Sequence, residues 1–312
     1  MKAGVTSTAY HAGAHCADSE LLDATIACPL CGFGGERRAV LTLQRDPDIV
    51  LLDCPTCKGV SASRMPKPET LAGYYANYRQ DTDLKVTFFS PAKFAGHILG
   101  LAGNLWDREV LRILDFGGAD GSLAVALAEK LLSVKGGVRS AIFVDVIDFS
   151  QDPTNPKDPS ITVRRLSSLE ETVGASYDLA IASSVMEHIP EPNPVFRSLF
   201  RALRPGGCLY ARSPFIVPVL RIFDRLGLTF DFTYPAHVHD MGKEFWEGLP
   251  GRLYADETQI KLRHSHPSPV ETTFQQDPLR TMAAHLLKLP WRFAPNRYHL
   301  VGGWEVLFER TK

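Results

Sequence analysis

A short apolar run that leads directly into a cluster of glycines restricts the possible folds of this chain more than any other feature. Residues 112–116 have the composition of a buried strand, residues 117–121 contain three glycines, and residues 122–133 have the spacing of an amphipathic helix. Glycine permits positive φ and lets a ligand approach the backbone closely. The first turn of a helix leaves N–H groups free for a carboxylate or a phosphate. The pattern predicts a strand, turn and helix that bind a ligand.

Strand-like and helix-like segments alternate after this turn. The apolar runs with strand character are residues 141–146, 179–182, 208–212, 260–264 and 303–310. Residues 194–203 have the pattern of a helix. Strands separated by helices pair in parallel through right-handed crossovers. The sequence therefore predicts an α/β fold, with a Rossmann-like, mainly parallel sheet covered by helices on both faces.

The residues around the turn indicate which kind of ligand it binds. A nucleotide phosphate loop has a Lys followed by Ser or Thr after its last glycine, whereas Ser122 and Leu123 follow Gly121 here. The carboxylate of Asp115 would repel a pyrophosphate, but it suits a cofactor that carries a positive ammonium group. The turn is therefore interpreted as the binding site of such a cofactor.

An acidic residue at the end of the next predicted strand is the candidate for binding a ribose. Asp145 ends the run 141–146 in this interpretation, and a carboxylate in that position can accept hydrogen bonds from both ribose hydroxyls. Asp148 is the alternative. Asp145 is preferred because a strand that ended at Asp148 would bury Asp145 in its middle at a substantial cost.

Two further segments make the pattern specific. Residues 177–190 combine an apolar run with Glu187 and His188, and residues 203–209 contain an Arg-Pro-Gly-Gly turn. Together with the glycine-rich turn and the acid that follows it, they resemble the class I S-adenosylmethionine-dependent methyltransferases over roughly residues 84–215. The resemblance implies S-adenosylmethionine as the cofactor and methyl transfer as the reaction.

The resemblance also implies which residues contact the cofactor. The turn holds the methionine part, the acid after the second strand binds the ribose, and the loop after the fourth strand faces the sulfonium and the acceptor. Ala119 replaces the usual middle glycine, and Ser167 or Ser168 stands where the family often has an Asp for the adenine amino group. The implied cofactor-binding residues are Asp115, Gly117, Gly118, Ala119, Gly121, Asp145, Ser167 and Ser184.

Four of the six cysteines form two Cys-x-x-Cys pairs, and this spacing is typical of a zinc site. Four thiolates leave no coordination position for water, so the predicted role is structural. Short strand-like runs at 39–43 and 49–52 suit a zinc ribbon, and the segment that follows resembles methyltransferases with a zinc ribbon ahead of the catalytic domain. The predicted zinc ligands are Cys28, Cys31, Cys54 and Cys57.

These patterns predict how the chain is divided. The expected parts are a mobile tail (1–20), a zinc-ribbon domain (21–65), a linker with a helix (66–83) and a methyltransferase domain (84–312). An aromatic-rich, acceptor-specific insertion is expected at about 216–300.

Candidate catalytic residues lie in two segments. A general base is needed only when the acceptor is an alcohol, a protonated amine or a carbon acid. His188, together with Glu187, stands on the loop that the resemblance places opposite the substrate; the alternative is that both residues pack against the following helix. His237 and His239 form the second candidate, with His237 preferred, and here the alternatives are a polar rim or a pair of metal ligands.

Charge and hydropathy exclude several classes of protein. The formal net charge is −1 and no block of like charge is present, which makes nucleic acid an unlikely partner. No segment has the apolar length of a secretory signal or of a membrane span. We therefore expect a cytoplasmic protein without a membrane partner, and the sequence leaves its oligomeric state open.

The predicted function is S-adenosylmethionine-dependent methyl transfer to a small-molecule acceptor, such as a sugar or another biosynthetic intermediate. One alternative is an RNA methyltransferase that uses the zinc ribbon to bind nucleic acid. Another is a non-catalytic adaptor that keeps the cofactor fold and binds a protein partner.

Overall fold

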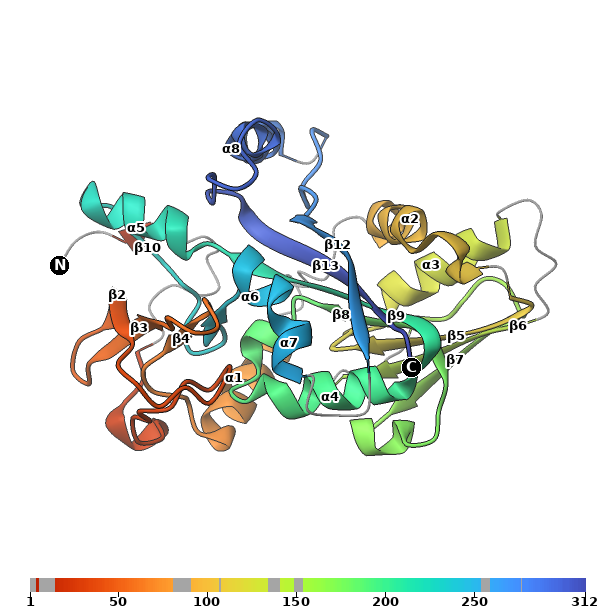
Figure 1. Cartoon of the computed structure of the whole chain (residues 1–312), viewed down its shortest axis with the longest axis horizontal. Helices are drawn as coiled ribbons and strands as arrows, with labels where there is room; N and C mark the ends of the chain where they lie inside the picture. The colour runs from red at the N-terminus through yellow and green to blue at the C-terminus, as the bar shows by residue number, and fades with distance from the viewer. Residues whose placement is uncertain are drawn as a thin grey trace.

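The chain is built around one large sheet and one small sheet (Figure 1), and β1 (Gly4–Val5) and β10 (Thr229–Phe230) form a separate parallel pair. The computed structural model describes residues 4–5, 15–80, 91–106, 108–133, 141–148, 154–253, 259–275 and 277–312. Residues 1–14, apart from 4–5, and the predicted boundary between residues 83 and 84 lie outside the described residues.

The large sheet has seven strands in the order β12-β13-β9-β8-β5-β6-β7. Its strands are β5 (Val110–Phe116), β6 (Ala141–Ile147), β7 (Ile161–Leu166), β8 (Tyr177–Ser183), β9 (Leu203–Phe215), β12 (Ile260–Pro267) and β13 (Gly302–Arg310). The strands from β5 to β9 pair in parallel, whereas β12 and β13 pair antiparallel. The predicted α/β fold is confirmed.

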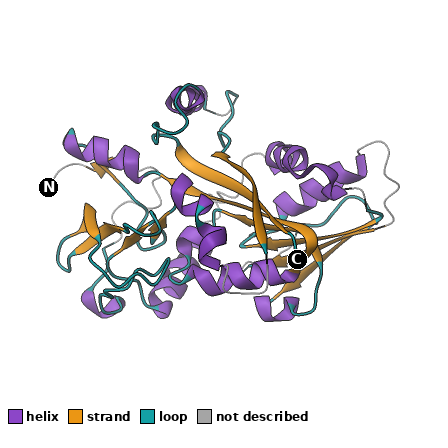
Figure 2. Ribbon diagram, viewed as in Figure 1, coloured by secondary structure: helices purple, strands orange, loops and turns teal. Residues whose placement is uncertain are grey.

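Helices cover both faces of this sheet (Figure 2). The helices are α1 (Pro68–Gln80), α2 (Pro91–Ala102), α3 (Ser122–Ser133), α4 (Pro192–Ala202), α5 (Val217–Arg225), α6 (Lys243–Glu247), α7 (Leu249–Leu253) and α8 (Pro278–Lys288). In Figure 1, α2 and α3 lie over one face, and α4 lies over the other. Within the described residues, no helix combines the length and the apolar character needed to cross a membrane.

The alternation of side chains along β8 explains why both faces are apolar. Leu179 and Ile181 pack in the cluster that contains α2 and α3, whereas Ala180 and Ala182 pack in the cluster that contains α4. Successive residues of a strand point to opposite faces, and every residue of β8 is buried. The central strands of a parallel sheet are covered on both sides in this way.

The small sheet contains the predicted zinc ribbon but extends beyond it. Its order is β11-β4-β3-β2, and all three pairings are antiparallel. The strands are β2 (Arg38–Gln44), β3 (Ile49–Asp53), β4 (Val60–Ala62) and β11 (His239–Asp240). Since β11 comes from the predicted methyltransferase domain (84–312), called the catalytic part below, the ribbon is not an isolated sheet.

The ribbon also shares an apolar core with the catalytic part. Leu30 and Cys54 pack in the same cluster as Phe196, Phe245 and Trp246. Cys16, which belongs to the segment predicted as a tail, is buried, and its backbone exchanges two hydrogen bonds with the side chain of Gln44.

Candidate functional site

The glycine-rich turn follows β5 and alternates between ordinary and left-handed backbone. Gly117, Ala119 and Gly121 have φ of 70°, 50° and 75°. The N–H of Gly117 donates to the carbonyl of Ile147 at 2.8 Å, which fixes the turn to the end of β6. A Cβ atom on Gly118 would lie 2.3 Å from Cγ of Asp115, so only glycine fits between the turn and that carboxylate.

Asp115 lies beneath this turn. Its side chain is buried, and Oδ2 has no hydrogen-bond partner among the described residues. Burial, and then the nearby charge of Asp148, raise the pKa of Asp115 to about 7. A buried acceptor without a partner is costly, and an ammonium group of a cofactor would supply the missing donor. The turn and Asp115 therefore fit the methionine part of S-adenosylmethionine.

Ala119 is held in its left-handed conformation by two residues. Its N–H donates to Oδ2 of Asp148 at 2.9 Å, and its carbonyl accepts from Nη2 of Arg165 at 3.1 Å. Left-handed backbone costs a residue with a Cβ roughly 1–2 kcal/mol. The methyl group of Ala119 is therefore compatible with the turn, because Asp148 and Arg165 stabilise its strained conformation.

The structure corrects the position assigned to Asp145. Strand β6 continues to Ile147, so Asp145 lies in the middle of the strand and not at its end. Two hydrogen bonds from Arg164, at 2.8 and 2.9 Å, and one from the hydroxyl of Tyr177, at 2.6 Å, compensate its burial. The acid at the end of β6, level with the glycine-rich turn, is Asp148.

The two predicted serines lie in different surroundings. Ser167 follows β7 directly, is exposed, and its N–H donates to Oε1 of Glu171 at 2.6 Å. Ser184 follows β8, has φ of 54°, and its N–H donates to the carbonyl of Arg212 at 2.9 Å. The next residue, Val185, is so close to the glycine-rich turn that a Cβ on Gly117 would lie 2.4 Å from its side chain. The loop after β8 therefore contacts the turn.

Glu187, His188 and His237 converge on this loop. Their ligand atoms all lie within 4.8 Å of one another, and Nε2 of His188 is 3.9 Å from Oε1 of Glu187. Glu187 is fully buried, and neither carboxylate oxygen has a hydrogen-bond partner among the described residues. Burial raises its pKa to about 8.

The ring of His188 is held in place by its neighbours. Nδ1 lies 3.0 Å from the carbonyl of Ala236 and 3.0 Å from the hydroxyl of Tyr75 in α1, and the ring packs against His237 with centroids 4.7 Å apart. A carbonyl oxygen can only accept, so we assign the hydrogen to Nδ1. Nε2 is then the basic atom, on the side of Glu187.

The pair His237 and His239 does not form a joint site. His239 is fully buried, with Nδ1 3.1 Å from Oγ of Ser61 and Nε2 2.9 Å from the carbonyl of Ile189. Burial lowers its pKa to about 4, so it is neutral near pH 7. His239 therefore connects the ribbon to the loop after β8, whereas His237 lies beside His188.

The four predicted zinc ligands come together as the spacing required. The Sγ atoms of Cys28 and Cys57 are 3.8 Å apart, and those of Cys31 and Cys54 are 3.6 Å apart. These distances are much longer than a disulfide bond of about 2.05 Å. A tetrahedral zinc ion with Zn–S bonds of about 2.3 Å separates its ligands by about 3.8 Å. The cluster therefore fits a four-thiolate zinc ion.

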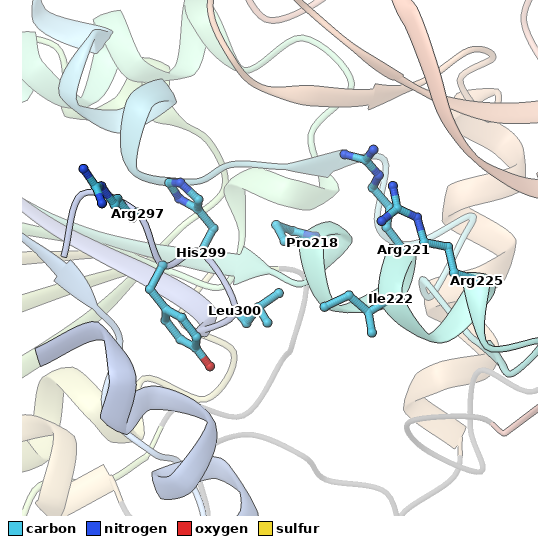
Figure 3. Close-up of a pocket in the computed structure, with 8 residues that line it drawn as sticks. Pro218, Arg221, Ile222, Arg225, Arg297, His299 and Leu300 are labelled. Atoms are coloured by element: carbon cyan, nitrogen blue, oxygen red, sulfur yellow. The ribbon is translucent and has the colours of Figure 1, made fainter. Parts of the chain in front are cut away.

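A cavity of about 320 Å³ opens beside the carboxyl end of β9, where α5 begins. Figure 3 shows its two walls, α5 on one side and residues 297–300 on the other. It is lined by Pro218, Arg221, Ile222, Arg225, Arg297, Tyr298, His299 and Leu300. Arg221 and Arg225 belong to α5, whereas Arg297 comes from a segment distant in the sequence, so only the fold brings the three arginines to one cavity.

A mainly parallel sheet with a glycine-rich turn after β5, an acid after β6 and a polar loop after β8 defines a class I S-adenosylmethionine-dependent methyltransferase. Residues 79–245, just over half of the chain, match the family described as "Methyltransferase domain", and the chain belongs to this family. The four-cysteine cluster in the small antiparallel sheet is consistent with a zinc ribbon.

Several known proteins are similar to this chain. The ubiquinone biosynthesis O-methyltransferase of Escherichia coli O9:H4 is 25% identical over 208 residues, which cover 59% of this chain and 76% of that protein. The protein of the same name from Pseudomonas fluorescens is 26% identical over 148 residues, 46% of this chain and 60% of that protein.

Solved structures also align with the chain at low sequence identity. A plantazolicin methyltransferase is 13% identical, with a TM-score of 0.42, over 78% of this chain and 92% of that one. Coclaurine N-methyltransferase is 10% identical, with a TM-score of 0.39, over 74% of this chain and 81% of that one.

Proposed function

We propose that this methyltransferase acts on a hydroxyl group of a small molecule, with Glu187 and His188 as its acid–base pair. The observation that carries the proposal is the fully buried carboxylate of Glu187, which has no hydrogen-bond partner among the described residues and stands on the loop that contacts the cofactor turn. Uncompensated buried carboxylates with raised pKa values are typical of catalytic sites.

Binding of the cofactor is assigned to the ends of β5, β6 and β8. Asp115 would accept from the ammonium group, the turn from Gly117 to Gly121 would surround the methionine part, and Asp148 replaces Asp145 as the proposed ribose-binding acid. Ser167 remains the candidate for binding the adenine amino group. Ser184 remains the candidate on the loop that faces the sulfonium and the acceptor. When bound, S-adenosylmethionine supplies an electrophilic methyl group on a sulfonium, which is a good leaving group.

The chain's own residues then have to align the acceptor and remove its proton. Nε2 of His188 is the basic atom, because Nδ1 donates to Ala236. As this nitrogen takes the hydroxyl proton, the adjacent carboxylate of Glu187 stabilises the resulting imidazolium. The ring of His237 packs on the ring of His188. An alcohol acceptor needs such a base, and the similarity to the ubiquinone biosynthesis O-methyltransferase of Escherichia coli supports this acceptor class.

The cavity beside β9 supports an acceptor that carries a negatively charged group. Arg221, Arg225 and Arg297 line it, and no ion pair to a carboxylate is present for any of them within the part of the chain that the structure describes. Guanidinium groups bind carboxylates and phosphates through paired hydrogen bonds. A cavity of this size suits a small molecule, which we favour over RNA.

We also propose that the four cysteines bind zinc and that this zinc is structural. The sulfur separations of 3.6 and 3.8 Å support four-coordinate binding without a water position.

The pH dependence of methyl transfer tests the acid–base pair. The Glu187 carboxyl is protonated below its pKa of about 8 and ionised above it. With a hydroxylated acceptor, kcat should rise up to about tenfold per pH unit below pH 8 and level off above it. Glu187→Gln should lower kcat by about 10²–10⁴-fold, remove this rise, and leave the Kd of S-adenosylmethionine unchanged.

The measurement is transfer of a labelled methyl group to a panel of hydroxyl, amine and carbon acceptors, with and without an acidic group. A Glu187→Gln enzyme with the wild-type rate and pH profile would contradict the proposed pair. Methylation of amines alone would contradict the proposed acceptor class.

A further inference from the structure

A second group of metal-binding side chains lies apart from the cysteines and from Glu187. His97 belongs to α2, His264 to β12 and Glu305 to β13, so three segments distant in sequence supply one residue each. Their ligand atoms all lie within 4.8 Å of one another. We call these three residues the His–His–Glu cluster.

The cluster lies on the face of the sheet that α2 covers. Glu305 pairs across the sheet with Arg212 of β9, which in turn pairs with Ser183 at the end of β8. The guanidinium of Arg212 stacks over the ring of Phe94 in α2 at 4.5 Å. The cluster is therefore two strands away from the loop that contains Glu187.

Both imidazoles converge on the same oxygen of Glu305. Nε2 of His97 is 2.8 Å from Oε1, and Nε2 of His264 is 3.0 Å from it. Ligands that bind a metal at about 2.1 Å and at right angles to each other are about 3.0 Å apart. Both nitrogen–oxygen distances therefore match those of adjacent ligands around one ion, and the two nitrogens lie within 4.8 Å of each other.

The surroundings hold the cluster in this arrangement. The hydroxyl of Tyr210 donates to the other oxygen of Glu305 at 2.8 Å, and the ring of His264 stacks on His266, with centroids 4.4 Å apart and planes 12° apart. Hydrogen bonds of this kind orient metal ligands in proteins.

The cluster is accessible on the histidine side. The side chain of Glu305 is 2% exposed, whereas those of His97 and His264 are 31% and 19% exposed. An ion can therefore enter from solvent. Three protein ligands would leave coordination positions for water or for another ligand, unlike the closed four-cysteine site.

From this geometry we propose that His97, His264 and Glu305 bind one divalent transition-metal ion, independently of the four cysteines. Two histidines and one carboxylate with open positions suit zinc or iron(II) rather than magnesium or calcium, which prefer oxygen ligands. The ion would connect α2, which packs on α3 behind the cofactor turn, to the C-terminal strands β12 and β13.

Cobalt(II) titration of the full chain tests the proposal. Protein dialysed against a mild chelator is first shown by elemental analysis to keep one zinc per chain in the cysteine site. It should then bind one cobalt per chain with weak visible bands and without the intense thiolate-to-cobalt band. His97→Gln and Glu305→Gln should each weaken this binding by more than about 100-fold, and Tyr210→Phe should weaken it by about tenfold.

The control variant is His285→Gln, which removes a histidine of α8 that stacks on Phe274 away from the cluster and should leave cobalt binding unchanged. Melting temperatures without metal check that each variant is folded. X-ray absorption on the wild-type protein needs no variant and should show nitrogen and oxygen ligands around the added ion. Three results would overturn the proposal: no cobalt site besides the cysteines, sulfur ligands around the added cobalt, or unchanged cobalt binding by the folded His97→Gln and Glu305→Gln variants. Each would identify the cluster as a hydrogen-bonded network only.

Discussion

At the scale of single residues, the cofactor site depends on contacts between side chains and the backbone of the turn. Asp115 lies against Gly118 so closely that no Cβ fits, and Asp148 and Arg165 support the left-handed conformation of Ala119. Neither contact is visible from the composition of the turn alone. They explain why one glycine of the usual pattern can be replaced while its neighbour cannot.

Gly118→Ala should therefore disable cofactor binding. Its Cβ would lie 2.3 Å from Cγ of Asp115 and would displace that carboxylate, at a cost of about 1–3 kcal/mol in unfolding free energy. Calorimetry with S-adenosylmethionine should show at least a tenfold weaker Kd. Gly73→Ala in α1, where the new Cβ would meet no atom within 4 Å apart from its chain neighbours and the backbone of its own helix, is the matched control and should leave the Kd unchanged. Equal binding by both variants would show that Asp115 does not contact the cofactor.

Asp145 in β6 and Asp148 directly after β6 should respond differently to replacement by asparagine. Asp148→Asn should weaken cofactor binding, because its carboxylate is the strand-end acid and holds the turn through Ala119. Asp145→Asn should instead lower the unfolding free energy by about 2 kcal/mol, because it disrupts hydrogen bonds from Arg164 and Tyr177. Denaturant unfolding and calorimetry on both variants separate the two effects. A large loss of affinity in folded Asp145→Asn alone would restore that residue as the ribose ligand.

At the scale of elements, the loop after β8 is held between the ribbon and the main sheet. The carbonyl of Glu187 accepts from the N–H of Val238, and His239 in β11 contacts both Ser61 in β4 and the carbonyls of residues 189 and 190. The short strand β11 thus determines where Glu187 and His188 stand.

His239→Ala should loosen this loop without touching the acid–base pair. It leaves the buried Ser61 hydroxyl and the 189–190 carbonyls without their partner, which costs about 1–3 kcal/mol in unfolding free energy. We expect a lower melting temperature and a lower kcat, with little change in the Kd of S-adenosylmethionine. A stable variant with an unchanged kcat would show that β11 does not position the loop.

At the scale of the whole molecule, the ribbon and the catalytic part share one sheet and one apolar core. They share a four-stranded sheet, and the side-chain amide of Asn193 in α4 donates to the carbonyl of Leu30 at 3.1 Å. Three of the four cysteines, Cys28, Cys54 and Cys57, are buried in the same apolar cluster as residues of α4 and α6. Loss of the metal should therefore lower the stability of the chain beyond the ribbon.

Removal of zinc with a strong chelator should therefore destabilise the entire chain. Structural zinc contributes folding free energy directly. Because the cysteines pack in the same core as α4 and α6, loss of zinc should also destabilise those helices. A single melting transition should shift to lower temperature when circular dichroism and tryptophan fluorescence are followed together, since Trp246 is buried in that core. Two separate transitions, with the catalytic part unaffected, would contradict this prediction.

Features that depend on local chemistry could be predicted from the sequence. The alternation of strands and helices, the turn at 117–121 and the two Cys-x-x-Cys pairs follow from side-chain pattern, glycine conformation and ligand spacing, all of which act over a few residues. The predicted helix 122–133 has these same bounds in the structure.

Features that depend on partners distant in the chain became apparent only in the folded structure. Strand β6 extends past Asp145 because Ile147 pairs with Phe116 and Leu166, and because Arg164 and Tyr177 compensate the buried charge. The fold also pairs β11 with the ribbon. It likewise assembles the His–His–Glu cluster and the arginine-lined cavity from residues distant in the sequence. The physical reason is the same in each case: the free energy of a buried polar group is set by the residue that faces it, and sequence spacing does not reveal that residue.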